Sequence, residues 1–473
     1  MGGPTDVTAP ADGPADWVNR LSAVVLTAML IYVIVGIPEF DRDALETLQA
    51  ASTDAVNPLN RFVWLGLLAM AAPVMVARRA AISALLRANW PLVLLMLYFA
   101  ASALWALDPP VSARRVMFSV VQLVLAATLI SGLRRAVTLH ILIVAACAAA
   151  AAADLAVWIA MPGYAMTPEG LAGLQTQKNQ TGLLMMYGCL ASGTALFLVR
   201  GRPARWFMMG ALMMMLVLLV ATRSTTSQAI TLLTPVVVLC VLLAVRLSAP
   251  VIWALGAGLL ALLAGLAAAY LAWCALTDAD PWVPLRGATF TGRTDLWSFV
   301  LAEIEKRPWF GAGFSSLWAI NPAVQPSLQT GTWFGTYTII NEGHQGYLDL
   351  LATGGVVGFT GGMFVVLRAL GTALRAVSRA EPAHDAWRSG RLAFPSAVFH
   401  LSLVLSLLVH NLTESNLFTN NSLLAVALIL AVLDLGRWSS ALPHVAPATA
   451  APAAETFPPV APGGGVERAA PSA

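Results

Sequence analysis

Four positively charged side chains lie at or near the ends of long apolar segments, where they could bind a phosphate group. Lys178 precedes one such segment, and Arg223 lies in a Ser- and Thr-rich turn between two others. Arg293 follows a Thr-Gly pair, and Arg286 lies seven residues before it. Arg binds phosphate through a permanently charged, bidentate fork, and N–H groups at a helix start add donors. Gathered around one point, these cations would bind a diphosphate; singly, each could instead reach the lipid headgroups.

Two of the six histidines lie at ends of apolar segments on the side of these cations. They are His344, within a Gly-His-Gln-Gly run, and His410, which is followed by Asn411 and Glu414. A neutral imidazole with a pKa near 6.5 can take a proton from an attacking hydroxyl group. A single histidine is more often structural, so spacing alone leaves both roles open. The other four are His140, His384, His400 and His444.

The sequence predicts neither a metal site nor a cofactor. Asp278 and Asp280 are two residues apart, but no further carboxylate follows nearby to complete a Mg²⁺ site. The four cysteines all lie within apolar segments, as expected for small core residues without a disulfide framework. They are Cys147, Cys189, Cys240 and Cys274. We therefore expect a metal-independent reaction in which Arg neutralises the developing charge.

The composition places these residues in a membrane protein. Of 473 residues, 58% are hydrophobic and only 11% are charged, and the mean hydropathy is +0.76. Soluble domains carry about 25% charged residues, so the composition excludes a soluble enzyme, a disordered protein and a nucleic-acid-binding protein. The apolar runs are much longer than a strand and favour a helical bundle. We expect an all-α integral membrane protein.

Twelve apolar segments are long enough to predict transmembrane helices, since a hydrocarbon core of about 30 Å needs roughly 20 residues. Their approximate limits are 21–37, 62–77, 90–107, 116–130, 136–161, 181–199, 206–222, 229–245, 251–276, 348–367, 394–409 and 417–435. The expected organisation is a cytoplasmic tail at 1–20, a membrane domain at 21–435 and a disordered cytoplasmic tail at 436–473.

The distribution of Lys and Arg predicts the orientation of these helices. With a cytoplasmic N-terminus, seventeen of the 27 Lys and Arg residues fall in cytoplasmic connections, as the positive-inside rule requires. Both termini are then cytoplasmic, and Lys178, Arg223 and His344 face the opposite side. Arg114 and Arg115 also fall on that outer side, and the sequence leaves their roles open together with those of His410 and Glu414.

One connection is long, and long connections are usually functional. It spans residues 277–346, between the ninth and tenth predicted helices. Within it, we expect an amphipathic helix that begins at Thr294 and ends before Pro308. Its apolar side would lie on the membrane surface or pack on the bundle. That side comprises Leu296, Trp297, Val300, Leu301 and Ile304, with Asp295, Glu303, Glu305 and Lys306 on the opposite side.

From about Lys178 to Glu414, the chain resembles the O-antigen ligase and O-antigen polymerase superfamily of bacterial membrane glycosyltransferases, including its exopolysaccharide polymerase-like members. Five short motifs carry the resemblance in order, and the fourth is the most specific. They are Lys178-Asn179; Arg223-Ser224; Thr291-Gly292-Arg293 with Trp297; Arg307-Pro308-Trp309-Phe310-Gly311-Ala312-Gly313-Phe314; and His344-Gln345 followed by Gly355 and Gly358.

The resemblance implies transfer of a glycan from an undecaprenyl diphosphate carrier to an acceptor hydroxyl at the periplasmic face of the inner membrane, with inversion and without metal. By position, His344 would be the base or would orient the acceptor, and Arg223 and Arg293 would hold the diphosphate. Lys178 and Arg286 would assist. Gln345 replaces an Asn of many members and keeps the amide beside the substrate. The acceptor would be lipid A-core in a ligase of lipopolysaccharide, or a growing glycan in a polymerase.

A secondary transporter or a flippase for lipid-linked glycans is the alternative, because many helices with intramembrane ionisable groups suit a coupling relay. Its candidate residues are Asp154, His400 and Asp434, each within a predicted transmembrane segment. A transporter is expected to have symmetric halves, with charge near the middle of the membrane. Here the polar clusters gather at one face and in one asymmetric connection, which favours glycan transfer.

Overall fold

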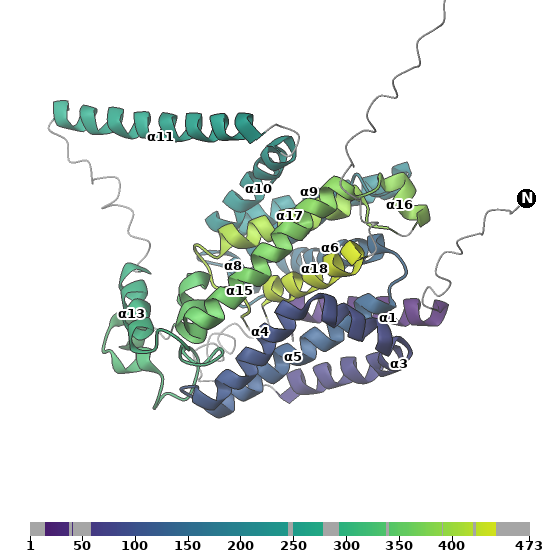
Figure 1. Cartoon of the computed structure of the whole chain (residues 1–473), viewed down its shortest axis with the longest axis horizontal. Helices are drawn as coiled ribbons and strands as arrows, with labels where there is room; N and C mark the ends of the chain where they lie inside the picture. Colours follow the sequence, from purple (N-terminus) through teal and green to yellow (C-terminus); the bar gives the residue numbers. More distant parts are fainter. Residues whose placement is uncertain are drawn as a thin grey trace, which may run out of the picture. The chain divides into compact units, whose positions relative to one another are not determined.

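The computed structural model describes residues 15–36, 40, 58–244, 249–277, 293–336, 340–389, 391–419 and 422–440, which are almost entirely helical (Figure 1). The α-helices are α1 (Asp16–Val35), α3 (Pro58–Ala88), α4 (Trp90–Ser102), α5 (Pro109–Gly132), α6 (Ala136–Ala160), α7 (Pro162–Ala165), α8 (Lys178–Ala195), α9 (Arg202–Thr222), α10 (Thr225–Ala244), α11 (Ala249–Thr277), α13 (Arg293–Lys306), α14 (Trp333–Thr336), α15 (Gly346–Arg379), α16 (Ala383–Ser389), α17 (Phe394–His410) and α18 (Leu423–Ser440). Two 3₁₀ turns, η1 (Ala103–Trp105) and η2 (Pro326–Gln329), and one antiparallel hairpin of β1 (Met166–Thr167) and β2 (Gly170–Leu171) complete these elements.

Every predicted apolar segment overlaps a helix in the described ranges, although the last predicted segment, 417–435, begins six residues before α18. Seven of these helices are long and apolar enough to cross a membrane, and shorter apolar helices include Trp90–Trp105 and Phe394–His410. The prediction of a polytopic, all-α membrane protein is therefore confirmed at this level, whereas the count of twelve spans and the orientation remain predictions. The seven are α1, α3, α5, α6, α9, α10 and α15.

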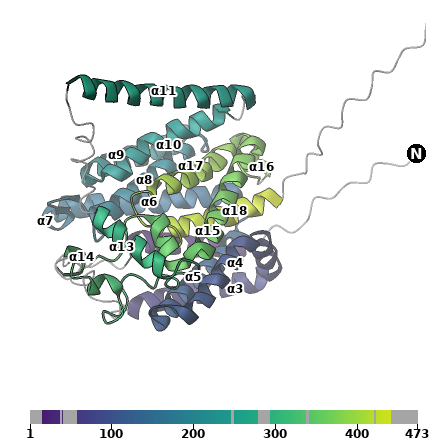
Figure 2. The same ribbon diagram turned by 60° about the vertical axis from the view of Figure 1, so that its left-hand side comes forward.

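The centre of the bundle is formed by α6, α8, α17 and α18, which lie side by side (Figure 2). Small side chains on α6, such as Ala146 and Ala151, are fully buried and let neighbouring helices approach closely. Of the four cysteines, Cys147, Cys189 and Cys274 are buried as predicted, but Cys240 is exposed. The prediction for Cys240 was wrong because the face of α10 that carries it does not turn into the bundle.

The helix predicted within the long connection is present as α13, and it packs on the bundle. Leu296 and Val300 are completely buried against α15 and its neighbours, which agrees with the packing alternative. The polar side was partly mispredicted, because Glu303 is also buried, in a 2.5 Å ion pair with Lys306. Leu301 is instead 48% exposed. The buried face follows the spacing i, i+4, i+7 from Leu296.

The most specific of the five motifs, Arg307 to Phe314, packs against a kink in α15. Gly355 has a φ of 61°, a left-handed conformation that interrupts the helix. The N–H groups beyond the kink donate to the motif instead of to α15 itself: Val356 to the carbonyl of Pro308 (2.8 Å) and Val357 to that of Trp309 (3.2 Å). A Cβ on Gly355 would lie 2.3 Å from the backbone of Trp309. This motif is therefore structural and fixes the connection onto α15.

The same motif also binds the start of α5, at the other side of the connection. The hydroxyl of Ser112 donates to the carbonyl of Phe314 (2.9 Å), and the backbone N–H of Asp108 donates to the hydroxyl of Ser316 (2.8 Å). The guanidinium of Arg115 donates to the carbonyls of Trp318 (2.9 Å) and Ala319 (2.6 Å). The connection is thus held between α5 and α15, and the residues that follow it are brought to a fixed position.

Candidate active site

The first turn of α15 and the turn after α17 form the base of the candidate site. The N–H of Gly346 donates to the carbonyls of Asn411 (2.9 Å) and Glu414 (3.1 Å). The N–H of Gln345 donates to the hydroxyl of Ser415 (3.1 Å). These backbone contacts join segments that are about seventy residues apart in the chain. They place the side chains of His344 and Glu414 next to each other.

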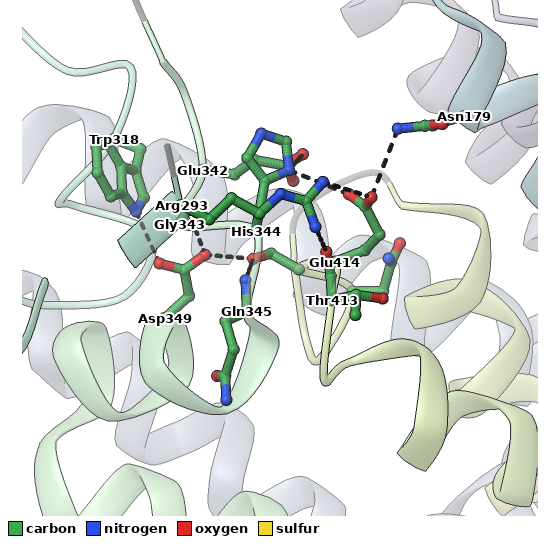
Figure 3. Close-up of polar contacts among 12 residues, drawn as sticks. Asn179, Arg293, Trp318, Glu342, Gly343, His344, Gln345, Asp349, Thr413 and Glu414 are labelled. Carbon is green, nitrogen blue, oxygen red and sulfur yellow. Dashed lines mark hydrogen bonds and ion pairs between the residues drawn. The ribbon is translucent and has the colours of Figure 1, made fainter. Parts of the chain in front are cut away.

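His344 lies between two carboxylates (Figure 3). Its Nδ1 atom is 3.1 Å from an oxygen of Glu342 and 3.1 Å from an oxygen of Glu414. Figure 3 shows the other ring nitrogen, Nε2, turned away from both carboxylates. Among the residues that the structure describes, none forms a hydrogen bond with Nε2. This arrangement fixes the ring through one nitrogen and presents the other to a reactant.

Arg293 completes the cluster on the far side of Glu414. Its guanidinium donates to the Glu414 carboxylate (3.2 Å) and to the carbonyl of Thr413 (2.7 Å). Figure 3 shows Arg293 reaching across from the start of α13 to this carboxylate. The contact to Thr413 and the salt bridge together orient the guanidinium plane. Sequence analysis placed Arg293 and His344 in one site, and the structure joins them through Glu414.

The charges of this cluster set its protonation. Burial alone lowers the pKa of the His344 imidazole, but the hydrogen bonds and charges of Glu342 and Glu414 outweigh it and raise the pKa to about 9. For Glu414, burial raises the pKa, but the bond and charge of His344 and the charge of Arg293 bring it below its ordinary value. At neutral pH the resting cluster therefore holds an imidazolium and a guanidinium against two carboxylates.

A second set of contacts holds the backbone of His344 in place. One carboxylate oxygen of Asp349 accepts from the N–H of Gly343 (2.8 Å) and from the hydroxyl of Ser415, and the other accepts from the Trp318 indole (2.9 Å). His344 itself has a φ of 50°, a left-handed conformation that costs about 1–2 kcal/mol for a residue with a Cβ. Because the surrounding contacts hold this strained position, the ring direction is defined before any substrate binds.

The remaining predicted cations lie at the start of α8 and in the α9–α10 turn. Lys178 is 3.6 Å from the carboxylate of Glu169, and Arg223 ends α9 with a φ of 54°. Arg223 lies beside Gly170, since a Cβ on that glycine would be 3.3 Å from the Cβ of Arg223. Lys178 and Arg223 thus meet around the β1–β2 hairpin. Arg286 lies outside the described residues.

Asn179 connects this cationic group with the histidine cluster. It follows Lys178 directly on α8, and its side-chain nitrogen lies 3.5 Å from the Glu414 carboxylate (Figure 3). Gln345, predicted to lie beside the substrate, caps α15 by accepting from the N–H of Leu348 (2.6 Å). The structure therefore gives Gln345 a structural contact, and its contact with substrate stays a prediction.

The roles that the sequence left open are partly resolved by these contacts. Glu414 connects His344, Arg293 and Asn179, as described above. His410 is buried, with its Nδ1 atom 3.2 Å from the Asn416 amide. The guanidinium of Arg115 donates to backbone carbonyls of the connection. Neither His410 nor Arg115 has a ring nitrogen or guanidinium directed at His344.

Sequence reasoning missed Glu342 and Asp349. Each lies within five residues of His344, but nothing in a one-dimensional pattern tells which acidic side chain turns toward the ring. A usable signal was the pair of carboxylates at two positions before and five after His344, because residues 306–380 contain no other acidic side chain. The burial of Asp349 among Trp318, Gly343 and Ser415 depends on the fold of the connection.

Glu342, His344 and Glu414 also form the kind of group that can hold a metal ion, since their ligand atoms lie within 4.8 Å of one another. A ligating imidazole must give up its proton to the metal, whereas here both carboxylates favour the imidazolium. Glu414 is already neutralised by Arg293 at 3.2 Å. The residues present therefore suit an ion-paired cluster better than a divalent cation.

Comparison with protein families gives a match to part of the chain. Residues 210–361 match the family model described as O-antigen ligase. The matched range begins within α9 and ends within α15, so it includes Arg223, Arg293 and His344 but not Glu414. None of the curated proteins matches the chain. The family match confirms the resemblance that the sequence motifs indicated.

Proposed function

We propose that this chain, which carries an O-antigen ligase domain at residues 210–361, transfers a glycan from an undecaprenyl diphosphate carrier to an acceptor sugar hydroxyl. The reaction would take place at the periplasmic face of the bacterial inner membrane, with both termini of the chain cytoplasmic. One observation carries the proposal: His344 is held through Nδ1 by two carboxylates at 3.1 Å, one of which also pairs with Arg293, and Nε2 is turned away from both carboxylates (Figure 3).

His344 would act as the base. The acceptor oxygen attacks the anomeric carbon of the donor sugar, and its proton passes to Nε2 of His344. As the new carbon–oxygen bond forms, the bond to the diphosphate oxygen breaks, and the electron pair leaves with the diphosphate. A single displacement of this kind inverts the anomeric centre. Glu342 and Glu414 stabilise the imidazolium that forms, as the carboxylate of a catalytic triad does.

The cations would stabilise the leaving group. Negative charge grows on the bridging oxygen of the diphosphate, so a fixed guanidinium stabilises the transition state more than the ground state. Arg293 is the cation joined to the histidine cluster, whereas Arg223 and Lys178 lie together at the β1–β2 hairpin. We assign the diphosphate to these three side chains, without a metal and with Arg286 as a further candidate.

The raised pKa of His344 limits how much of the enzyme carries a free base. With a pKa of about 9, about one molecule in a hundred has a neutral imidazole at pH 7. The rate should then increase with pH over the neutral range. This dependence distinguishes a base from a residue that only orients the acceptor as an imidazolium.

The acceptor is left to experiment between two candidates. In a ligase it is the lipid A-core sugar, and in a polymerase it is a growing glycan on a second carrier lipid. Purified protein incubated with its own lipid-linked glycan, with and without lipid A-core, would separate them on gels and by mass spectrometry. Lengthened glycan on the carrier indicates a polymerase, and labelled lipid A-core indicates a ligase. Activity retained in EDTA supports the metal-independent assignment.

The test of the site uses two histidine variants. His344→Ala should lower transfer by about 10²–10⁴-fold, the usual contribution of a general base, while the protein remains folded, with a lower unfolding temperature because the imidazolium that pairs with two carboxylates is lost. His384→Ala is the matched control, because His384 is exposed on α16 and pairs with Asp385; it should retain full activity. Full activity in His344→Ala would exclude the catalytic assignment.

A further inference from the structure

A pocket adjoins the histidine cluster. Its side chains differ in charge from the cationic group of Lys178 and Arg223. Its volume is about 460 Å³, within the range of pockets that bind small organic ligands. Its walls come from the end of α1, the first turns of α8 and the segment after α17. We call it the amide pocket, after the side chains of Gln175, Gln177, Asn179, Gln180 and Asn416 that line it.

The polar lining of the amide pocket is neutral or acidic. Hydroxyl groups of Thr176, Ser415, Thr419 and Ser422 lie among the amides, and the two carboxylates of the histidine cluster reach its edge. Among the described residues that line it, none is Lys or Arg. A diphosphate would be repelled by the carboxylates and would find no permanent cation. Sugar hydroxyls, in contrast, both donate and accept, as amides and hydroxyls do.

Helix α8 lies between this pocket and the two cations at the β1–β2 hairpin, Lys178 and Arg223. At 100° per residue, Gln177, Gln180 and Leu184 share one face of α8, and all three line the pocket. Lys178 begins a different face, on which Gly182 packs against Ser224 in the turn that contains Arg223. One face of α8 thus offers amides and the other lies toward the cations. The two faces suit two chemically different parts of a glycan-transfer reaction.

Part of the pocket lining is apolar and buried. Ile34, Leu183 and Leu184 are buried below the polar lining, where they can pack against the carbon face of a sugar ring. Asp154 holds the wall in place by accepting from the N–H of Leu174 (2.8 Å). Asp154, a candidate for a transport relay, is therefore a positioning residue for this wall.

We propose that the amide pocket binds an uncharged sugar of the acceptor glycan and directs one of its hydroxyls to the Glu342–His344–Glu414 cluster. This inference rests on the proposed glycan transfer and names the acceptor's site within it. The pocket includes Glu342 and Glu414 in its lining, so a hydroxyl bound there adjoins the groups that hold the base. The donor diphosphate stays on the side of the cations.

A bulky side chain at Gln180 tests the proposal. Gln180 is exposed, and its side-chain oxygen accepts only from Thr176 (2.6 Å) among the bonds of its amide that the structure describes. Gln180→Trp should fill part of the cavity without disturbing the core. Gln329→Trp is the matched control, since Gln329 is an exposed glutamine in η2, bonded to the Pro322 carbonyl. Gln177→Trp, at another exposed position of the lining, serves if the first variant does not fold.

Binding is measured with the full-length protein in lipid nanodiscs and two probes. The first is the free oligosaccharide repeat released from the organism's own lipid-linked glycan, and the second is undecaprenyl diphosphate without sugar. Gln180→Trp should weaken oligosaccharide binding by about tenfold or more and leave undecaprenyl diphosphate binding unchanged. In the transfer assay, KM for the acceptor should rise, with KM for the donor unchanged.

Two results would overturn the proposal. Weaker binding of undecaprenyl diphosphate with unchanged binding of the oligosaccharide would assign the pocket to the donor carrier. Unchanged binding of both probes in Gln180→Trp and Gln177→Trp would show that no ligand occupies it. If the wild-type protein binds the oligosaccharide in this pocket but transfers no glycan, the proposed function fails while the sugar site stands.

Discussion

Two of the histidine–carboxylate pairs among the described residues differ in what surrounds them. His400 on α17 lies 2.9 Å from Asp434 on α18, and both side chains are only 3% exposed. His344 lies 3.1 Å from Glu414, with 23% of its side chain exposed and the amide pocket beside it. The chemical groups are alike, but only the second pair can be reached by a substrate. Access and neighbouring charge, not residue type, distinguish a candidate active site from a structural contact.

The same comparison weakens the transport alternative. A relay needs successive partners, yet the Nδ1 atom of buried His400 has no hydrogen-bond partner in the part of the chain that the structure describes. The carboxylate of Asp154 instead accepts from the backbone N–H of Leu174. The three candidate relay residues therefore fall into one buried pair, His400–Asp434, and one positioning contact, that of Asp154. Glycan transfer remains the better supported proposal.

The strongest test of this comparison makes the same chemical change in both pairs. Glu414→Gln removes a negative charge that pairs with both the His344 imidazolium and the Arg293 guanidinium. We expect transfer to fall by about 100-fold, as for groups that orient a catalytic residue, and stability to fall by about 1–3 kcal/mol because two buried charge-assisted bonds are weakened. The measurement is the initial rate of glycan transfer at saturating substrates. A Glu414→Gln enzyme with wild-type rate would remove the distinction between the two pairs.

The pH dependence of transfer sharpens the comparison further. Because the base is the neutral imidazole and its pKa is about 9, the rate should rise about tenfold per pH unit below that value and level off above it. Glu342→Gln removes one of the charges that raise the pKa, so the curve should move to lower pH. A rate that falls with increasing pH would show that His344 acts as an imidazolium.

Stability should change with pH in the opposite direction. A pKa raised from 6.5 to about 9 in the folded protein means that protonated His344 stabilises the fold. That contribution is fully present below pH 6.5 and is lost as the pH rises through about 9. Thermal unfolding of the wild type and of Glu342→Gln over this range measures the difference. The cluster therefore gains activity under conditions in which it contributes less to stability.

The smallest effect on transfer is expected from a change in the His400–Asp434 pair. Asp434→Asn keeps a hydrogen-bonding group beside His400 but removes its charge, which should cost about 1–3 kcal/mol of stability. The transfer rate should remain within about twofold of wild type, because neither side chain reaches the amide pocket or Arg293. The variant is compared with Glu414→Gln in the same nanodiscs. A large loss of transfer without unfolding would implicate the His400–Asp434 pair in the reaction.

Some properties of this protein follow from the sequence alone. Its hydropathy and its apolar segments predicted the helices, because a helix in a membrane is a local solution to backbone hydrogen bonding. The amphipathic spacing predicted α13, and the cation and histidine motifs predicted Arg293 and His344 as members of one site. The helices and α13 needed only side-chain type, length and period, whereas the joint role of Arg293 and His344 was implied by the resemblance to the O-antigen ligase and polymerase superfamily.

The tertiary structure decided which groups surround His344. Glu414 is 70 residues from His344 in the chain, and no local pattern determines that a turn after α17 meets the first turn of α15. The direction of Glu342, the burial of Glu303 and the raised pKa of His344 all depend on those long-range contacts. A pKa is a property of charges in space, so the sequence could name the histidine but not its protonation. The separation of amides from cations across α8 likewise follows from packing.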